Sequence, residues 1–137
     1  MDNQKSQKCI TWFFDSGKKM CEEWTKEGDF YREDKPAIIQ YYESGKVSSE
    51  SYFNNGLLTV RISYYKNGKI SGKAIYVEGK NHTDTNYFED GTISQEYYYI
   101  NDLLVTRIKY KNNQIKLLSK YNDWEEVNEN KTNIPTL

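Results

Sequence analysis

The sequence has almost no net charge and no long apolar run. Its 19 basic and 20 acidic residues leave a formal net charge of -1, which gives no long-range attraction toward nucleic acid or anionic lipid. No apolar stretch approaches the roughly 18 residues of a membrane-spanning helix, and residues 1–8 lack the apolar segment of a signal peptide. We therefore expect a cytoplasmic protein that is not secreted and binds no nucleic acid, with a membrane partner disfavoured.

Cysteine and histidine are also scarce, which argues against a disulfide framework, a metal centre and an enzyme. The hairpin register derived below pairs Cys9 with Trp24 and Trp12 with Cys21, so we interpret the two cysteines as ordinary thiols in a reducing compartment. His82 is the single histidine, and no nucleophile or second base accompanies it in a motif. We expect no catalytic residues, no metal site and no cofactor.

What the chain does contain is a short signature that recurs along its length. Two aromatic residues, a variable residue and a polar residue precede a glycine or its substitute, as in residues 41–45 and 64–68. The glycine position falls at 17, 28, 45, 56, 68, 79, 91, 102 and 113, so the steps are 11 or 12 residues with one step of 17. Two steps make a repeat of about 23 residues, which is typical of a repeat protein.

The segments between these turns fit extended strands. Asn55-Gly56, Asn67-Gly68 and Asp90-Gly91 are strong hairpin signals because these residue types tolerate the positive φ of a tight turn. Consecutive hairpins predict an all-β fold, an elongated single-layer antiparallel meander of about ten strands. We place this repeat domain at residues 9–123, after a polar segment at 1–8 and before a short capping segment and flexible tail at 124–137.

A two-residue turn also predicts which side chains face each other. The residue three before the glycine should face the residue two after it, which gives pairs of an aromatic with an aliphatic side chain. These pairs are Tyr42–Val47, Phe53–Leu58, Tyr65–Ile70, Phe88–Ile93, Tyr99–Leu104 and Tyr110–Ile115. Small residues such as Ser49, Gly72 and Ala74 continue the same face, which we predict to be packed and concave.

Alternation along each strand sends the other aromatic of each doublet to the opposite face. We predict that this second face binds a partner, because rows of aromatic side chains beside charges have the composition of interface hot spots. Its expected partner-binding residues are Trp24, Tyr41, Tyr52, Tyr64, Tyr87, Tyr98, Arg61, Lys73 and Arg107. Alternating charges on it, including Glu50, Asp84 and Glu96, suggest cross-strand ion pairs.

The pattern breaks at two places. The step of 17 residues holds an insertion centred on residues 32–37, which is either a contact for a partner or a tolerated connection. Near the end, Asp123 and the following Trp124-Glu125-Glu126 predict a short helix whose tryptophan covers the open end of the sheet. Residues 128–137 are expected to be disordered.

The doublets, the polar-glycine turns and the 23-residue period resemble the MORN (membrane occupation and recognition nexus) repeat, in its variant found in bacterial and giant-virus proteins. Residues 42–47 and 65–70 carry the typical run, and residues 31–37 are similar to an element in repeats of giant viruses of amoebae. The resemblance covers residues 10–121. It implies a non-enzymatic scaffold or interaction module, in the host cytoplasm if the source is viral.

Within that resemblance several uses of one surface stay open. The leading hypothesis is binding of a protein partner. A narrower alternative is an antitoxin or immunity protein that binds a cognate toxin, which a toxin gene beside this one would favour. A third is a self-assembling structural protein of a giant virus, a homo-oligomer joined through its edge strands or its aromatic face, because an open meander leaves two edges unpaired.

Overall fold

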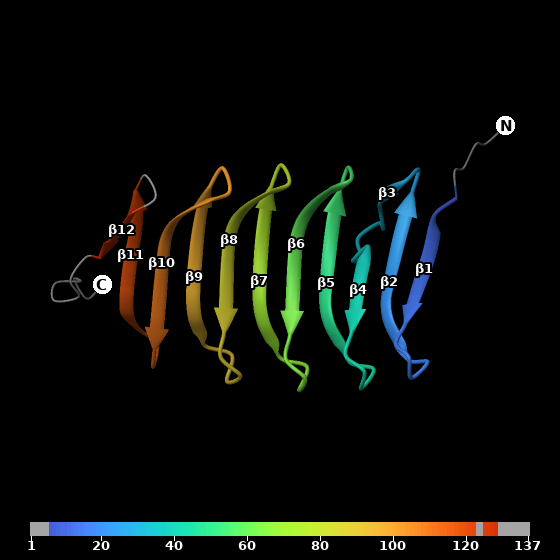
Figure 1. The fold of residues 1–137 in the computed structure, drawn as a ribbon, viewed down its shortest axis with the longest axis horizontal. Coiled ribbons are helices and arrows are strands. Elements are labelled where there is room, and N and C mark those ends of the chain that lie inside the picture. Colours follow the sequence, from blue (N-terminus) through green and yellow to red (C-terminus); the bar gives the residue numbers. More distant parts are fainter. Residues whose placement is uncertain (1–5, 123–124, 129–137) are drawn as a thin grey trace.

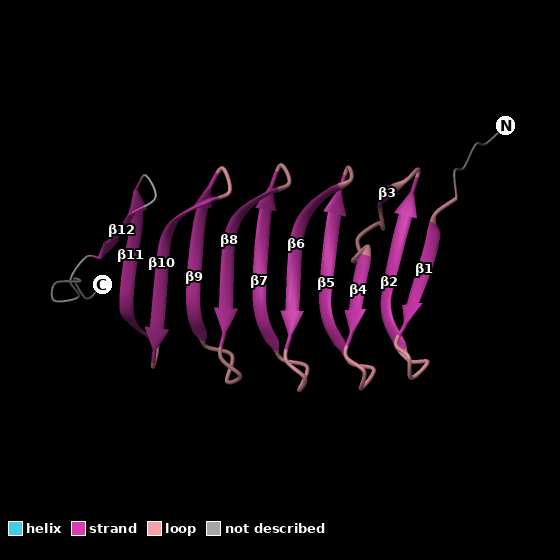
Figure 2. Ribbon diagram, in the orientation of Figure 1, coloured by secondary structure: helices cyan, strands magenta, loops and turns pink. Residues whose placement is uncertain are grey.

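The computed structural model describes residues 6–122 and 125–128, which form one open antiparallel sheet. The strands stand side by side in a row (Figure 1), and the described residues contain strands and loops without a helix (Figure 2). Spatial order follows chain order, except that β3 pairs with β2 beside this path. The predicted all-β, single-layer meander is therefore confirmed. The strands are β1 (Lys8–Phe13), β2 (Lys19–Lys26), β3 (Asp29–Phe30), β4 (Ile38–Tyr41), β5 (Val47–Asn54), β6 (Leu57–Tyr64), β7 (Ile70–Val77), β8 (Lys80–Tyr87), β9 (Ile93–Ile100), β10 (Leu103–Lys111), β11 (Gln114–Asn122) and β12 (Glu125–Asn128).

The two long rims of the sheet carry different turns. On one rim, two-residue turns such as Asn55-Gly56 have positive φ at both positions, 48° and 75°, as a type I′ turn requires. On the other rim, wider turns such as residues 65–69 close with Gly68 N–H donating to Tyr65 O at 2.9 Å and Tyr65 N–H donating to Lys69 O at 2.8 Å. Only the glycine has positive φ in these wider turns, 87° at Gly68. The last turn on this rim, Asn112-Asn113, is again of the two-residue kind.

The wider turns correct part of the predicted register. Ile70 pairs with Tyr64 instead of Tyr65, and Val47 and Ile93 likewise pair with Tyr41 and Tyr87. The displaced aromatic has another task, because the Tyr65 hydroxyl donates a 2.6 Å hydrogen bond to Tyr87 O in the next repeat. Tyr42 donates in the same way to Tyr64 O at 2.6 Å. The pairs predicted at two-residue turns are confirmed: Phe53–Leu58, Tyr99–Leu104 and Tyr110–Ile115.

A β-bulge follows the hairpin turns, and it changes which side chains share a face. In the β5–β6 hairpin Phe53 pairs with Leu58 but Tyr52 pairs with Val60, so Thr59 is the extra residue. The register shifts in the same way between β9 and β10, where Val105 is extra. Behind a two-residue turn, the bulge moves every later residue of the second strand to the face opposite the one that simple alternation predicts.

The insertion after β3 is built into the sheet. Ala37, which is completely buried, accepts a 2.8 Å hydrogen bond from Trp24 N–H and donates one of 2.9 Å to Ser51 O. The rings of Phe30 on β3 and Phe53 on β5 also lie close together, with centroids 4.9 Å apart. These contacts favour the interpretation of this segment as a structural connection between β2 and β5.

The C-terminal expectation is wrong where it can be tested. Glu125 and Glu126, expected in a helix, begin strand β12, which pairs with β11 through Tyr121–Glu126 and Asn122–Glu125. Asn128, expected to be disordered, is the last residue of that strand. Asp123, Trp124 and residues 129–137 lie outside the described residues, as do residues 1–5.

A single layer buries few side chains. Cys21 is 7% exposed and Ser119 is completely buried, whereas Cys9 is exposed. The predicted pairing of Cys9 with Trp24 and of Trp12 with Cys21 is confirmed, and both thiols are free. The described residues include no helix long and apolar enough to cross a membrane.

Candidate functional site

One face of the sheet carries most of the predicted partner-binding residues. Residues paired across strands point to the same side, and one row runs through Glu22, Ile39, Glu50, Ile62, Lys73, Thr85 and Glu96. Side chains two positions along a strand share that side. The tyrosine–carboxylate face, as we name it, therefore comprises this row together with Trp24, Tyr41, Tyr52, Tyr64, Tyr87, Tyr98 and Tyr110.

Tyrosine hydroxyls on this face donate to glutamates of the preceding strand in the sheet. Tyr64 on β6 donates to Glu50 on β5 at 2.8 Å, and Tyr110 on β10 donates to Glu96 on β9 at 2.5 Å. Tyr41 on β4 bears the same relation to Glu22 on β2, at 3.0 Å. The contact is thus a repeated unit, in which a glutamate in mid-strand meets a tyrosine at the rim. Glu50 and Glu96 were expected in cross-strand ion pairs, but they accept hydrogen bonds from tyrosines instead.

Burial and these hydrogen bonds alter the acidity of the face. Partial burial and the neighbouring carboxylate raise the pKa of Tyr64 to about 12, and the same causes raise that of Tyr110 to about 12. Burial followed by the nearby glutamate also raises the pKa of Tyr41, Tyr52 and Tyr98. These phenols therefore stay protonated and remain hydrogen-bond donors throughout the physiological range.

The end of the face at β2 contains a cation as well. Burial alone would raise the pKa of Glu22, but hydrogen bonds from Lys19 and Tyr41 outweigh it and hold the pKa below its usual value. Lys19 forms an ion pair with Glu22 and lies 5.1 Å from the centre of the Tyr41 ring. Trp24 is covered too, because the Arg32 guanidinium stacks 3.9 Å from its ring centre. At this end the aromatic groups already have cationic neighbours within the chain.

The repeated unit is interrupted at β7. Lys73 occupies the mid-strand position that Glu22, Glu50 and Glu96 hold in the other repeats. Tyr87 stands at the rim of β8, where Tyr64 and Tyr110 stand in theirs. Within the described part of the chain, no side chain accepts a hydrogen bond from the Tyr87 hydroxyl, and Lys73 is exposed. Among the described repeats, we name this unit the Lys73–Tyr87 gap, because its tyrosine hydroxyl has no glutamate of the chain as acceptor and its lysine is exposed.

Two predicted site residues lie on the opposite face. Arg61 pairs with Ser51 and donates to its hydroxyl at 3.4 Å, and Arg107 pairs with Tyr97 and donates to Gln95 at 3.1 and 3.3 Å. Asp84 was expected among the charges of the partner-binding face, but it also lies on the opposite face. The bulge at Thr59 is the physical reason for Arg61, the bulge at His82 for Asp84 and the bulge at Val105 for Arg107, since one extra residue reverses the alternation behind a two-residue turn.

The opposite face has a shallow hollow of its own. It holds about 230 Å³ between Arg61 and Asp84, with Gly72, Ala74 and Ser63 in its lining. Tyr99 donates to Asp84 at 3.1 Å, and burial and this carboxylate raise the pKa of Tyr99 to about 12. Arg61 and Asp84 form hydrogen bonds with residues outside this lining, namely Ser51, Asn81 and Tyr99, and the second carboxylate oxygen of Asp84 is buried without a hydrogen-bond partner among the described residues.

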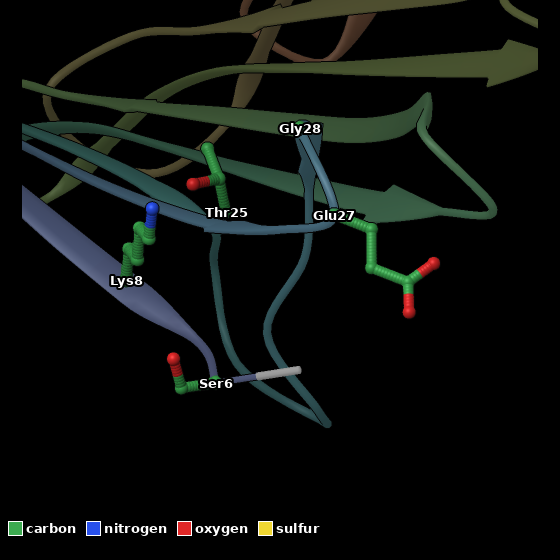
Figure 3. A pocket seen from close by; sticks show the side chains of 5 residues that line it. All are labelled: Ser6, Lys8, Thr25, Glu27 and Gly28. Carbon is green, nitrogen blue, oxygen red and sulfur yellow. The ribbon is translucent and has the colours of Figure 1, made fainter. Parts of the chain in front are cut away.

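Two further hollows among the described residues lie at the rims. One of about 430 Å³ is lined by Ser6, Lys8, Thr25, Glu27 and Gly28. In Figure 3 the Lys8 and Thr25 side chains point to the same side, whereas the Glu27 carboxylate points away from them. Among residues 6–122 and 125–128 no group of three or more acidic, histidine or cysteine residues could hold a metal ion.

The prediction from sequence missed Tyr110 and the role of the glutamates. Tyr110 was assigned to the packed face, but it holds the same rim position as Tyr64 and Tyr87 because the Asn112-Asn113 turn is shorter. The spacing contains the signal, since residues 41, 64, 87 and 110 lie 23 residues apart. The mid-strand glutamates were read only as charges, although they organise the rings around them.

Comparison with known proteins agrees with the repeat pattern. Residues 38–55 and 59–78 match the family model described as "MORN repeat variant". These two segments span β4 to β7, including the hairpin between β5 and β6. In these two segments the repeat pattern agrees with the variant MORN repeat, as the resemblance to that family predicts.

Other comparisons add little. No curated protein matches the sequence of this chain. Among solved structures, one titled "Crystal structure of GtfA/B complex bound to UDP and GlcNAc" is similar over 66% of this chain and 22% of that chain, at 12% identity and a TM-score of 0.46. A likeness this weak carries no functional argument.

Proposed function

We propose that this protein is a non-enzymatic binding module and that its partner is a protein seated on the tyrosine–carboxylate face. MORN repeats are commonly protein-binding or membrane-binding modules, and the absence of long-range electrostatic attraction favours the first use. The surface residues of the proposal are Trp24, Tyr41, Tyr52, Tyr64, Tyr87, Tyr98 and Lys73. Arg61 and Arg107 are left out because they lie on the opposite face.

The observation that carries the proposal is the Lys73–Tyr87 gap. In the other repeats a glutamate of the chain accepts the rim tyrosine's hydrogen bond. At the gap the ammonium of Lys73 and the hydroxyl of Tyr87 are both donors, so the group that completes the unit is an acceptor with negative charge. An aspartate or glutamate of the partner fits that description.

Rings on both sides of the gap supply the apolar part of the surface. Tyr64 on β6 lies at the same rim as Tyr87, whereas Tyr98 on β9 pairs with Thr83, toward the other rim, and is 38% exposed. Hydrogen bonds fix the Tyr64 ring before binding, which lowers the conformational entropy that association costs. A pre-ordered aromatic row around one charged anchor has the make-up of an interface hot spot.

The test compares two tyrosines on adjacent strands that face opposite sides. Tyr87→Ala on β8 changes the proposed surface, and Tyr97→Ala on β9 is the matched control on the opposite face. Each variant is used as bait in native lysate beside the unaltered chain, and captured proteins are quantified by mass spectrometry. The proposal expects one set of proteins to be lost with Tyr87→Ala and retained with Tyr97→Ala, both baits having unchanged far-UV circular dichroism. Loss with Tyr97→Ala alone would assign binding to the other face.

A further inference from the structure

Strand β1 is an edge strand with an unprotected outer side. Among the described strands it pairs with β2 alone and stands first in the sheet. Ile10, Trp12 and Phe13 are 48%, 51% and 59% exposed. Edge strands are usually guarded by charge, proline or shortness, but residues 9–14 contain neither a charged residue nor proline. The edge strand at the other end, β12, has only four residues.

The hydrogen bonds of Trp24 reveal which backbone groups of β1 are free. Trp24 N–H donates to Ala37 O at 2.8 Å, and Trp24 O accepts from Tyr31 N–H at 3.0 Å, so both groups point away from β1. Cys9, the partner of Trp24, is therefore in a non-hydrogen-bonded pair, and its own N–H and C=O point outward. By alternation those of Thr11 and Phe13 do the same. Phe14 N–H, which donates to Lys18 O across the hairpin at 2.8 Å, agrees with this alternation.

We propose that two copies of this chain join edge to edge through β1, antiparallel and related by a twofold axis at Thr11. This register uses the outward groups of Cys9, Thr11 and Phe13, so that Cys9 faces Phe13 of the second copy and Thr11 faces itself. Ile10 then lies opposite Trp12 of the second copy, in the closer, non-hydrogen-bonded kind of pair. An aromatic opposite a β-branched side chain is a favoured cross-strand pair, and the twofold axis forms it twice.

The charges at the two ends of β1 also favour the antiparallel arrangement over a parallel one. Between residues 8 and 17 the only charged side chains are Lys8 and Asp15, one at each end of β1. An antiparallel pair brings Lys8 of one copy opposite Phe14 of the other, next to its Asp15, whereas a parallel pair would align like charges. The product is one sheet of doubled length that presents two tyrosine–carboxylate faces on the same side. This inference rests on the β1 edge and is independent of the proposed partner.

The register is tested by disulfide cross-linking. In a chain that carries Cys9→Ser and Cys21→Ser, Thr11→Cys places two thiols in a hydrogen-bonded pair about 5.5 Å apart at Cα, within disulfide range. Ile10→Cys is the matched control, because two residues of offset, about 7 Å along the strand, put its thiols out of reach. We expect mild oxidation to yield covalent dimer with Thr11→Cys and to leave Ile10→Cys monomeric. Equal cross-linking of the two, or none with Thr11→Cys, would overturn the register.

Mass by light scattering tests the association itself. The unaltered chain should have twice the mass of a single chain, and Thr11→Pro should halve it, because proline removes an outward N–H that β2 does not use. Ile10→Lys, at an exposed position, should also give the single-chain mass and supplies a second route if proline disturbs folding. A monomeric unaltered chain would overturn the proposal. So would a mass that grows without limit as concentration rises, which indicates head-to-tail pairing of β1 with β12.

Discussion

The Tyr64 hydroxyl lies 2.8 Å from a carboxylate oxygen of Glu50 on the neighbouring strand. The same diagonal contact recurs between Tyr110 and Glu96 and between Tyr41 and Glu22. Each hydrogen bond joins a tyrosine at the rim to a glutamate in mid-strand and leaves the faces of the tyrosine ring uncovered. The rings are therefore both ordered and accessible. A sheet that buries few side chains thus obtains a defined surface from hydrogen bonds along its face.

The Tyr64–Glu50 contact should stabilise the fold measurably. We expect a double-mutant cycle of Tyr64→Phe and Glu50→Gln to give a coupling free energy of about 0.5–1 kcal/mol, since the bond is charge-assisted but only partly shielded from water. The matched cycle of Tyr87→Phe and Lys73→Gln should give coupling near zero, because no bond joins those residues. Urea unfolding measures both cycles, and equal coupling in the two would show that the contact contributes nothing specific.

Alkaline pH should weaken the sheet through the same phenols. The pKa of Tyr64 and of Tyr110 is about 12 in the folded chain against an ordinary value of 10.0, so folding favours the neutral form. The resulting stabilisation is complete below pH 10 and is lost as pH rises through 12. We expect the free energy of unfolding to fall across that window, and to fall less steeply in a Tyr64→Phe/Tyr110→Phe variant. Identical slopes for variant and unaltered chain would contradict the assignment.

Two nearby glycines should respond differently to alanine. Gly68 has φ of 87° and open space around its missing Cβ, so Gly68→Ala should cost about 1–2 kcal/mol from backbone strain alone. Gly72 lies within strand β7, where an added Cβ would meet the movable Asn86 Oδ1 at 3.2 Å, so Gly72→Ala should be close to neutral. Thermal melts compare the two variants. A larger loss of stability at Gly72 would mean that Asn86 cannot move aside and that the hollow on the opposite face has no room for a methyl group.

Lys73→Glu should complete the interrupted repeat. A carboxylate at this position would accept the Tyr87 hydrogen bond as Glu50 accepts that of Tyr64, so folding stability should be kept or slightly increased. Urea unfolding of the variant beside the unaltered chain measures this stability. Binding of an acidic partner should be lost at the same time, because the charge of the gap is reversed. A variant that keeps its partner would show that the gap is not the anchor.

The strand order could be predicted from sequence because the residue types at the turns identify them. Asn55-Gly56 and Asn67-Gly68 recur at steps of 11 and 12 residues, and local pairing then leaves one topology. The face on which Arg61 and Arg107 lie could not be predicted from sequence. The bulges that place them occur at Thr59 and Val105, which are residue types common in regular strands. The alternation of 11 and 12 did contain a signal for two turn types. Lys73 lies on its predicted face because two register shifts cancel: the wide turn before β7 shifts the pairing by one residue, and the bulge that follows shifts it back.

The proposed binding surface is tested most directly by the dissociation constant of the purified captured partner, measured by calorimetry with Tyr87→Ala and Tyr97→Ala. Truncating a central aromatic anchor typically costs more than about 1–2 kcal/mol, or roughly tenfold in affinity. We predict at least that weakening for Tyr87→Ala, with Tyr97→Ala binding as the unaltered chain does. Equal dissociation constants for Tyr87→Ala and the unaltered chain, with both folded, would contradict the account.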